Sequence, residues 1–575
     1  MNKKLFKPLI VAVILTATIC FFTGCNESNS EPVAKAPNGT YIGQNNNGID
    51  EFLGIRYGEM ENFKAPTDIT TTTDDTIEAK KWGENCIQPY DAVEVASQDP
   101  CSQDCLFLNI WTKDIETKNK PVIMFIHGGG FVRGGSTDPM YDGEEFIRNL
   151  PENEDAVFVT INYRLSFMGG ADLSVLDGYT DEYYDAINLS HLDQTQALKW
   201  IDKNIEAFGG DPERINVAGQ SSGGNAVQLL MSDPKTNKYI KGGIEDSGVA
   251  FFVMETKEEM KASSKRIFEI LGVTSVDELT ALTDEEISKK MNQITSEVNT
   301  GLRCADGKII SETWWDDQRN GAAKDINLLI GSTNGEFDYH SMNWDDFPNP
   351  YEDYTVLEKK LRERHENSSS NLNLNQASSE EIFADLPENR DPVYGSLDFF
   401  NYDGLLENYL NLGDDKAQLM QDLYNDSLAP YPNTLIADAQ SQYNENTYLY
   451  YWEWAPEKTS VIDYAGDSAE VSPWGRALHC MDACIAFGTL EEGYPELTGD
   501  PEKIPEKLVQ QTQLMWYYFA KTGNPNNETI SEWTPYTEEV PSTMVITPEG
   551  KWECRDNYRQ EAMDVLSVMR PFGEM

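Results

Sequence analysis

Residues 219–223 read Gly-Gln-Ser-Ser-Gly, a G-x-S-x-G pattern that follows an apolar run at 215–218 and leads into a second run, Gly-Asn-Ala-Val-Gln-Leu-Leu-Met, at 224–231. The first run predicts a buried strand and the second predicts a helix, so the serine lies at a strand-to-helix turn. Only small residues fit beside such a tight turn, which lifts the serine hydroxyl above the sheet at the positive end of the helix. The pattern indicates that Ser221 is a nucleophile, but five residues alone are a weak signal.

A second glycine-rich stretch lies upstream, where a strand-like run at 121–126 ends in His-Gly-Gly-Gly-Phe at 127–131. Glycines allow the backbone to approach a substrate without Cβ clashes, and their N–H groups are suitable donors for an oxyanion hole. An ordinary glycine turn after a strand is the alternative interpretation. The serine turn downstream favours the oxyanion hole.

Longer motifs then support both assignments. They read QDCLFLN at 103–109, INYRL at 161–165, LDQTQALKWI at 192–201, NIEAFGGDP at 204–212, FAKTGNPN at 519–526 and WTPY at 533–536. In this order they resemble the type-B carboxylesterases, the cholinesterase-like group of the α/β-hydrolase fold. The resemblance spans roughly residues 39–536 and is poor at about 340–446. Two departures are Gln103, where the family has Glu, and a Gly-Gln-Ser-Ser-Gly elbow, where it more often has Gly-Glu-Ser-Ala-Gly.

The resemblance implies a catalytic triad in the chain order Ser, acid, His. The sequence contains five histidines, which are His127, His191, His340, His365 and His479. His127 and His191 precede the serine. His340 lies too close behind the candidate for the acid, Glu336, and His365 lies in a polar stretch typical of a surface loop. His479 remains as the base, in a segment that resembles the family's H-x-x-E-x-x-x-x-F-G loop.

The acid is predicted at Glu336, which follows the apolar run at 328–330. The family places its triad carboxylate in such a loop after a strand, so this assignment depends on the resemblance. Asp338 and the pair at 316–317 are alternative acids whose spacing fits less well. Any one of the 97 Asp and Glu residues is otherwise expected to lie at the surface.

The resemblance also implies an oxyanion hole made by the N–H groups of Gly129, Gly130 and Ser222, with Ser247 and Asp482 as supporting residues around the acid. For Ser247, an ordinary serine at a strand end is equally compatible. The implied reaction is hydrolysis of a small-molecule carboxylic ester through an acyl-enzyme, without cofactor or metal. Two other classes stay open: a catalytically inactive esterase-like adhesion or binding protein, and another serine hydrolase such as a lipase or peptidase.

The fold class follows from the alternation of apolar runs with helical patterns. Strand-like runs occur at 122–126, 156–161, 215–218, 239–244, 327–330 and 447–454, with a helix near 191–208. This rhythm predicts an α/β protein with a large, mostly parallel sheet flanked by helices. Because the triad candidates are dispersed along the chain, one hydrolase domain at 39–575 is expected, with a helical cap-like insertion at roughly 340–446.

The formal net charge is −52 and the isoelectric point is about 4.3. A nucleic-acid partner is therefore not expected, because the phosphate backbone would be repelled. The charge weakly favours neutral or cationic substrates, since distant charges are screened within about 10 Å at moderate salt.

The N-terminus has the pattern of an export signal. Lysines at positions 3, 4 and 7 precede a stretch at 8–24 without charged residues, and Phe-Thr-Gly-Cys at 22–25 resembles a bacterial lipobox. The resemblance implies a signal peptide at 1–24, a lipid on Cys25 and a polar tether to residue 38, hence membrane anchoring on the extracytoplasmic side. Two alternatives are a secreted protein with an incidental cysteine and an uncleaved membrane anchor.

Export implies an oxidising compartment in which disulfides persist. Of nine cysteines, seven lie beyond the predicted signal and lipid site. The resemblance implies a disulfide between Cys86 and Cys105, for which Cys101 is a competitor. An odd total means at least one thiol outside intramolecular disulfides, and the sequence does not specify pairing of the remaining cysteines, Cys101, Cys304, Cys480, Cys484 and Cys554.

Overall fold

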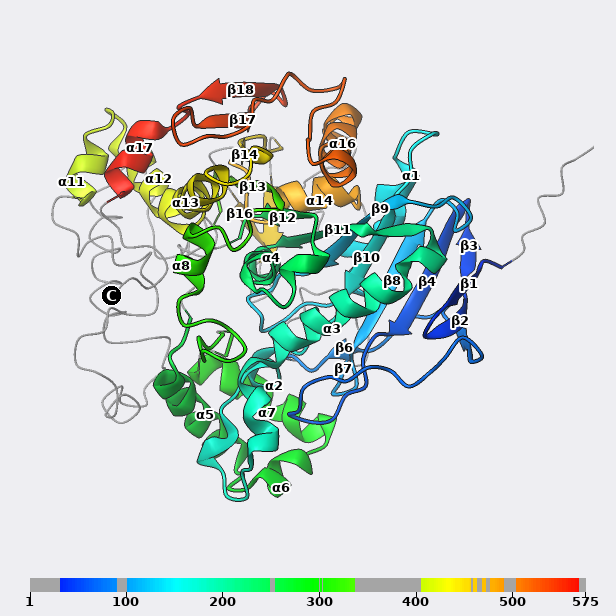
Figure 1. Ribbon diagram of the computed structural model, residues 1–575. Coiled ribbons are helices and arrows are strands. Elements are labelled where there is room, and N and C mark those ends of the chain that lie inside the picture. The colour runs from blue at the N-terminus through cyan, green and yellow to red at the C-terminus, as the bar shows by residue number, and fades with distance from the viewer. Residues whose placement is uncertain are drawn as a thin grey trace, which may run out of the picture.

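A central sheet of eleven strands organises the protein. The computed structural model (Figure 1) describes residues 31–89, 101–248, 254–298, 300–301, 303–336, 405–456, 459–462, 468–471, 476–490 and 503–567. In spatial order the strands are β18 (Trp552–Asp556), β17 (Ser542–Ile546), β14 (Thr447–Trp452), β13 (Asn327–Thr333), β12 (Gly242–Asp246), β11 (Gly210–Gln220), β9 (Lys120–Ile126), β10 (Val157–Ile161), β8 (Phe107–Thr112), β4 (Ile49–Arg56) and β3 (Gln44–Asn46).

The middle of the sheet is parallel and its two edges are antiparallel. Neighbouring strands from β17 through β14, β13, β12, β11 and β9 to β10 pair in parallel. β18 pairs antiparallel at one edge, and β8, β4 and β3 do so at the other. The carboxyl ends of the parallel strands therefore meet at one edge of the sheet, where α/β proteins build their sites.

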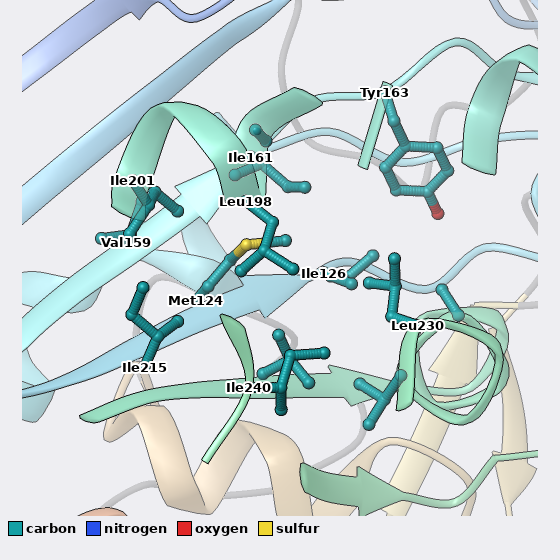
Figure 2. Packing of buried hydrophobic residues seen from close by; sticks show 14 of the residues in the cluster. Met124, Ile126, Val159, Ile161, Tyr163, Leu198, Ile201, Ile215, Leu230 and Ile240 are labelled. Atoms are coloured by element: carbon teal, nitrogen blue, oxygen red, sulfur yellow. The ribbon is translucent and has the colours of Figure 1, made fainter. Parts of the chain in front are cut away.

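Helices cover both faces because the strands are apolar on both sides. In β9, Met124 and Ile126 join one core cluster, whereas Ile123 and Phe125 join the other. The first face carries α3 (Leu189–Asn204), α4 (Ser222–Ser232) and α13 (Pro430–Ser441), and the second carries α1 (Gly143–Arg148), α14 (Met481–Phe487) and α16 (Glu506–Thr522). Figure 2 shows the first cluster, in which side chains of β9 and β10 face Leu198 and Ile201 of α3 and Leu230 of α4.

Smaller elements surround this core. They are β1 (Val33–Ala36), β2 (Gly39–Ile42), β5 (Thr76–Glu78), β6 (Asn85–Cys86), β7 (Cys101–Ser102), β15 (Thr459–Ile462), β16 (Ser468–Val471), α2 (Ser166–Gly169), α5 (Lys257–Leu271), α6 (Val276–Thr280), α7 (Asp284–Glu297), α8 (Trp314–Arg319), α11 (Leu405–Leu410), α12 (Lys416–Leu428) and α17 (Gln560–Leu566). Helices α5, α6 and α7 share a separate apolar cluster with α2 and the start of α3. Among the described helices, none is both long and apolar enough to cross a bilayer.

The architecture confirms the predicted α/β-hydrolase fold, with local differences. The run predicted as a strand from 239 begins as a short 3-10 turn at Asn237–Tyr239, and β12 starts only at Gly242. Of the predicted cap-like insertion, the described part is helical in α11, α12 and α13, and residues 340–404 lie outside the described ranges. The predicted signal peptide and Cys25 also lie outside them.

One disulfide joins Cys86 to Cys105, the pair that the resemblance implied, with their Cα atoms 5.0 Å apart. The competitor Cys101 instead has its sulfur 3.9 Å from Nε2 of Gln88. The loop closed by this bond ends where β8 begins, close to the edge of the sheet that carries the predicted site. A closed loop of this length contributes roughly 3 kcal/mol in the chain-entropy description.

Candidate active site

The turn between β11 and α4 has the strained geometry expected of a nucleophile elbow. Ser221 has φ of 57° and ψ of −125°, and the helix begins at the next residue. A Cβ on Gly219 would lie 2.3 Å from the Gly223 backbone, and a Cβ on Gly223 would lie 2.0 Å from the carbonyl oxygen of Ile126. Neither contact is possible, so both positions require glycine, and the serine is held at the sheet edge by its N–H bond to the Asp246 carbonyl at 2.9 Å.

The glycine-rich loop after β9 lies beside this turn. Gly129 and Gly130 have φ values of 98° and 65°, and a Cβ on Gly128 would lie 3.0 Å from Cβ of Ser221. Within the described part of the chain, no group accepts a hydrogen bond from the N–H of Gly129, Gly130 or Ser222. Three backbone donors beside the serine are thus available to a ligand, as an oxyanion hole requires.

Side chains hold this loop in place. The N–H of Phe131 donates to Oγ of Ser222 at 3.2 Å, and the N–H of Ser166 donates to the carbonyl of Phe131 at 2.7 Å. The Tyr163 hydroxyl donates to the His127 carbonyl at 2.8 Å, and the two rings stack with centroids 4.4 Å apart. Burial lowers the pKa of His127 to about 4, so this histidine is neutral and supports the loop rather than acting as a base.

The predicted acid and base lie in contact. Nδ1 of His479 hydrogen-bonds to Oε2 of Glu336, and Oε1 of the same carboxylate accepts from the N–H of Thr333 at 2.7 Å. Glu336 is fully buried and His479 is 4% exposed. The two loops are joined by a further bond from the Gly335 N–H to the Ala477 carbonyl at 2.8 Å, so acid and base are fixed relative to each other.

A residue that the sequence did not single out connects the base to the elbow. Nε2 of Gln220, immediately before Ser221, lies 3.2 Å from Nε2 of His479. This imidazole nitrogen faces away from Glu336 and is the one that a serine hydroxyl needs. Gln220 is 1% exposed, and its neutral amide occupies the position where the related motif more often has Glu.

A pair of buried carboxyl groups lies next to Glu336. Asp246 and Asp482 hydrogen-bond to each other, and the Tyr450 hydroxyl lies 3.1 Å from an oxygen of each. Burial raises the pKa of Asp482 to about 6 and that of Asp246 well above its ordinary value. The pair therefore holds one proton at neutral pH, which leaves one negative charge beside the acid of the site.

The packing of the strands explains this arrangement. In the register of the sheet, Gln220, Asp246, Gly331 and Tyr450 lie side by side on neighbouring strands. A Cβ on Gly331 would lie 2.2 Å from the Tyr450 ring, so the glycine lets the ring cross β13 toward Asp246. Asp246 and Tyr450 were missed by sequence reasoning, and only the alignment of strand ends identifies them.

The remaining sequence candidates differ in their surroundings. Ser247 is buried, with φ of 49°, and its hydroxyl has no hydrogen-bond partner among the described residues, so its supporting role stays a prediction. His191 is buried on α3 and precedes the elbow in the chain. Its Nε2 lies 3.2 Å from Oδ2 of Asp233, so this ring nitrogen already has a partner. The alternatives His340, His365 and Asp338 lie outside the described residues.

An eleven-stranded mostly parallel sheet with a strained serine elbow is the architecture of the α/β-hydrolases. The chain matches the model of the carboxylesterase family over residues 30–566 and belongs to that family. It is a carboxylic-ester hydrolase, as the resemblance implied.

Relatives cover most of the chain. It is 29% identical over 533 residues to the para-nitrobenzyl esterase of Bacillus subtilis (strain 168), covering 89% of this chain and 94% of that protein. It is also 29% identical over 468 residues to the liver carboxylesterase of Sus scrofa, covering 76% and 72% of the two chains. A solved thermophilic PNB esterase aligns with a TM-score of 0.72 at 25% identity, over 93% of this chain and all of the other.

Proposed function

We propose that this protein hydrolyses carboxylic esters through an acyl-enzyme on Ser221, with His479 as general base and Glu336 as the carboxylate that orients it. The observation that carries the proposal is the buried Glu336–His479 contact next to the strained elbow. The amide of Gln220 marks where Nε2 of the imidazole meets the elbow. Ester hydrolysis needs these groups together, because a serine hydroxyl is a weak nucleophile until a base removes its proton.

In the first half-reaction Oγ of Ser221 attacks the ester carbonyl while His479 takes its proton at Nε2. The bond from Nδ1–H to Glu336 keeps the imidazole in the required tautomer and stabilises the imidazolium. Negative charge develops on the carbonyl oxygen, where the N–H groups of Gly129, Gly130 and Ser222 are available to bind it. Loss of one such donor typically costs about 3 kcal/mol of transition-state stabilisation.

Collapse of this intermediate breaks the ester bond, and the imidazolium gives its proton to the departing alcohol. Water then occupies the place of the alcohol, and His479 removes its proton as it attacks the acyl-enzyme. A second tetrahedral intermediate uses the same three donors, and its collapse releases the carboxylic acid and the free serine.

The decisive experiment replaces the nucleophile. Ser221→Ala is expected to lower kcat on a short-chain p-nitrophenyl ester by at least about 10³-fold, as triad deletions do. Circular dichroism and the melting temperature of the variant should match those of the parent. Activity within about tenfold of the parent, in folded protein, would show that Ser221 is not the nucleophile.

We also propose that the enzyme is a membrane-anchored lipoprotein, on the basis of the charge-free stretch at 8–24 and the lipobox-like end at Cys25. A diacylglyceryl thioether supplies two acyl chains, and two chains anchor stably where one does not. Full-length protein made in a bacterium that processes lipoproteins should partition with membranes, and Cys25→Ser should abolish this. A mature chain starting elsewhere, or starting at Cys25 without lipid mass, would refute the anchor.

A further inference from the structure

The back of the glycine-rich loop is packed against Thr300, Gly301 and Arg303, which no motif of the sequence identifies. A Cβ on Gly301 would lie 2.1 Å from the Gly130 carbonyl oxygen, so the two backbones are in direct contact. Oγ of Ser166 donates to Oγ1 of Thr300 at 2.7 Å, and Ser166 itself holds the Phe131 carbonyl. The loop that offers the oxyanion donors is thus supported by this segment.

Arg303 makes the most unusual contact of the segment. Its guanidinium carbon lies 3.7 Å from the centroid of the Phe131 ring, close enough for a cation–π interaction. The same phenylalanine donates its N–H to Oγ of Ser222, the residue after the nucleophile. Arg303 therefore contacts Phe131, the residue that follows Gly130. Through Phe131 it is linked to Ser222, which supplies the third proposed oxyanion donor.

The charge of Arg303 is buried and has no directly bound carboxylate among the described residues. The residue is 2% exposed, and its Nε and Nη2 atoms have no hydrogen-bond partner among the described residues, within which no carboxylate forms an ion pair with it. Asp193, the acid whose charge acts on Arg303, is already bound by Arg164 at 2.7 Å. Burial lowers the pKa of Arg303 to about 10, so the group remains positive at neutral pH.

An unpaired buried cation is destabilising unless an opposite charge offsets it. In this loop an opposite charge forms during catalysis, because the carbonyl oxygen of the substrate becomes an oxyanion against Gly129, Gly130 and Ser222. We propose that Arg303 is a positioning residue of the oxyanion hole, holding the loop through Phe131 and keeping positive charge behind it. This rests on the proposed function of Ser221 and deepens it.

The test compares Arg303→Met, which removes the charge at similar length, with Arg303→Lys, which keeps it. A matched control is Arg555→Met, on the remote β18, where the arginine pairs with Glu553 at the surface. Each protein is assayed for kcat and KM on a neutral short-chain ester and for the Ki of an alkylboronic acid. In that adduct Oγ of Ser221 bonds to boron, its proton passes to His479, and the boronate becomes anionic.

Arg303→Met is expected to lower kcat by about tenfold or more with KM within about twofold, and to raise the boronate Ki by a similar factor. Arg303→Lys should keep both values within about threefold of the parent, and Arg555→Met should change neither. A merely structural role would lower the melting temperature and the amount of active enzyme without changing boronate affinity per active site.

Unchanged kcat and Ki in folded Arg303→Met would overturn the proposal. If that variant does not fold, Arg303→Lys tests the proposal instead. A tenfold rise in its boronate Ki, although the charge is retained, would contradict the role assigned to the charge. Failure of the proposed function is distinguishable, since it would appear in the parent protein as no boronate inhibition and in Ser221→Ala as retained activity.

Discussion

The two sides of the serine elbow carry opposite buried charge. On the side of the base, Glu336 contacts His479, and the Asp246–Asp482 pair adds a second negative charge. On the side of the glycine-rich loop, Arg303 is positive and without a carboxylate partner among the described residues. The first side is suited to an imidazolium on the proposed base, His479, and the second is suited to an oxyanion on the substrate in the proposed reaction.

This contrast shows that net charge says little about an active site. The chain carries a formal charge of −52, yet at the glycine-rich loop the buried His127 is neutral and the buried Arg303 is positive. Surface carboxylates are screened by salt and water, whereas buried groups within a few ångströms act in a low dielectric. Substitutions that alter one side of the elbow at a time therefore test the contrast.

The largest effect is expected from removal of the base. His479→Ala should lower kcat by about 10³-fold or more, because the serine hydroxyl loses the base that is proposed to accept its proton. His365→Ala, in a polar segment outside the described residues, is the matched control and should leave kcat within about twofold. The kcat of both variants is measured on one short-chain ester. Loss of activity in His365→Ala, with activity retained in His479→Ala, would overturn the proposed triad.

A smaller effect should follow from adding charge on the base side. The amide nitrogen of Gln220 lies 3.2 Å from Nε2 of His479, so Gln220→Glu places a negative charge beside this nitrogen, where it stabilises the imidazolium. Since only the neutral imidazole is active, the acid limb of the kcat/KM profile should move to higher pH by about one pH unit. Gln220→Met, which adds no charge, should leave the limb in place; equal shifts in both variants would refute this electrostatic explanation.

The smallest effect on rate is expected at Glu245, which neighbours Asp246 on β12 but points to the opposite face, against Gly224 of α4. It is fully buried and neither oxygen has a partner among the described residues, so burial raises its pKa to about 8. Its protonated form favours folding below pH about 4.5, and this contribution is lost as pH rises through about 8.

Glu245→Gln should therefore stabilise the protein at pH 8.5 by about 4 kcal/mol, with little change at pH 5 and kcat within about twofold. Melting temperatures at the two pH values measure this directly. A variant that is no more stable than the parent at the higher pH would show that this carboxyl does not fold in its protonated form.

Much of the fold was predictable, because buried parallel strands and the elbow leave local signals. The run at 121–126 is continuously apolar, the run at 215–218 is apolar except for Asn216, and the glycines at 219 and 223 are required by backbone contacts. The antiparallel edges were not predicted, since short strands such as β3 and β18 carry weak patterns and pair only through distant partners.

The site was predictable where a motif marks it and not elsewhere. Ser221, Glu336 and His479 lie in recognisable loops, and the structure places the last two in contact. Strand register and loop packing bring the neighbours of Asp246, Tyr450 and Arg303 together from distant parts of the chain. No local pattern distinguishes such a carboxylate or guanidinium from a residue at the surface.

The most direct test of the opposite charges is the pH dependence of kcat/KM in Asp482→Asn and Arg303→Met, measured beside the parent. Above pH about 6 Asp482 is ionised, so its neutralisation should move the acid limb to lower pH by about one unit, as the imidazolium loses a stabilising charge. Arg303→Met should lower the plateau value of kcat/KM without moving the acid limb to lower pH. An acid limb that stays fixed or rises in Asp482→Asn, or falls in Arg303→Met, would contradict the assignment of opposite charge to the two sides.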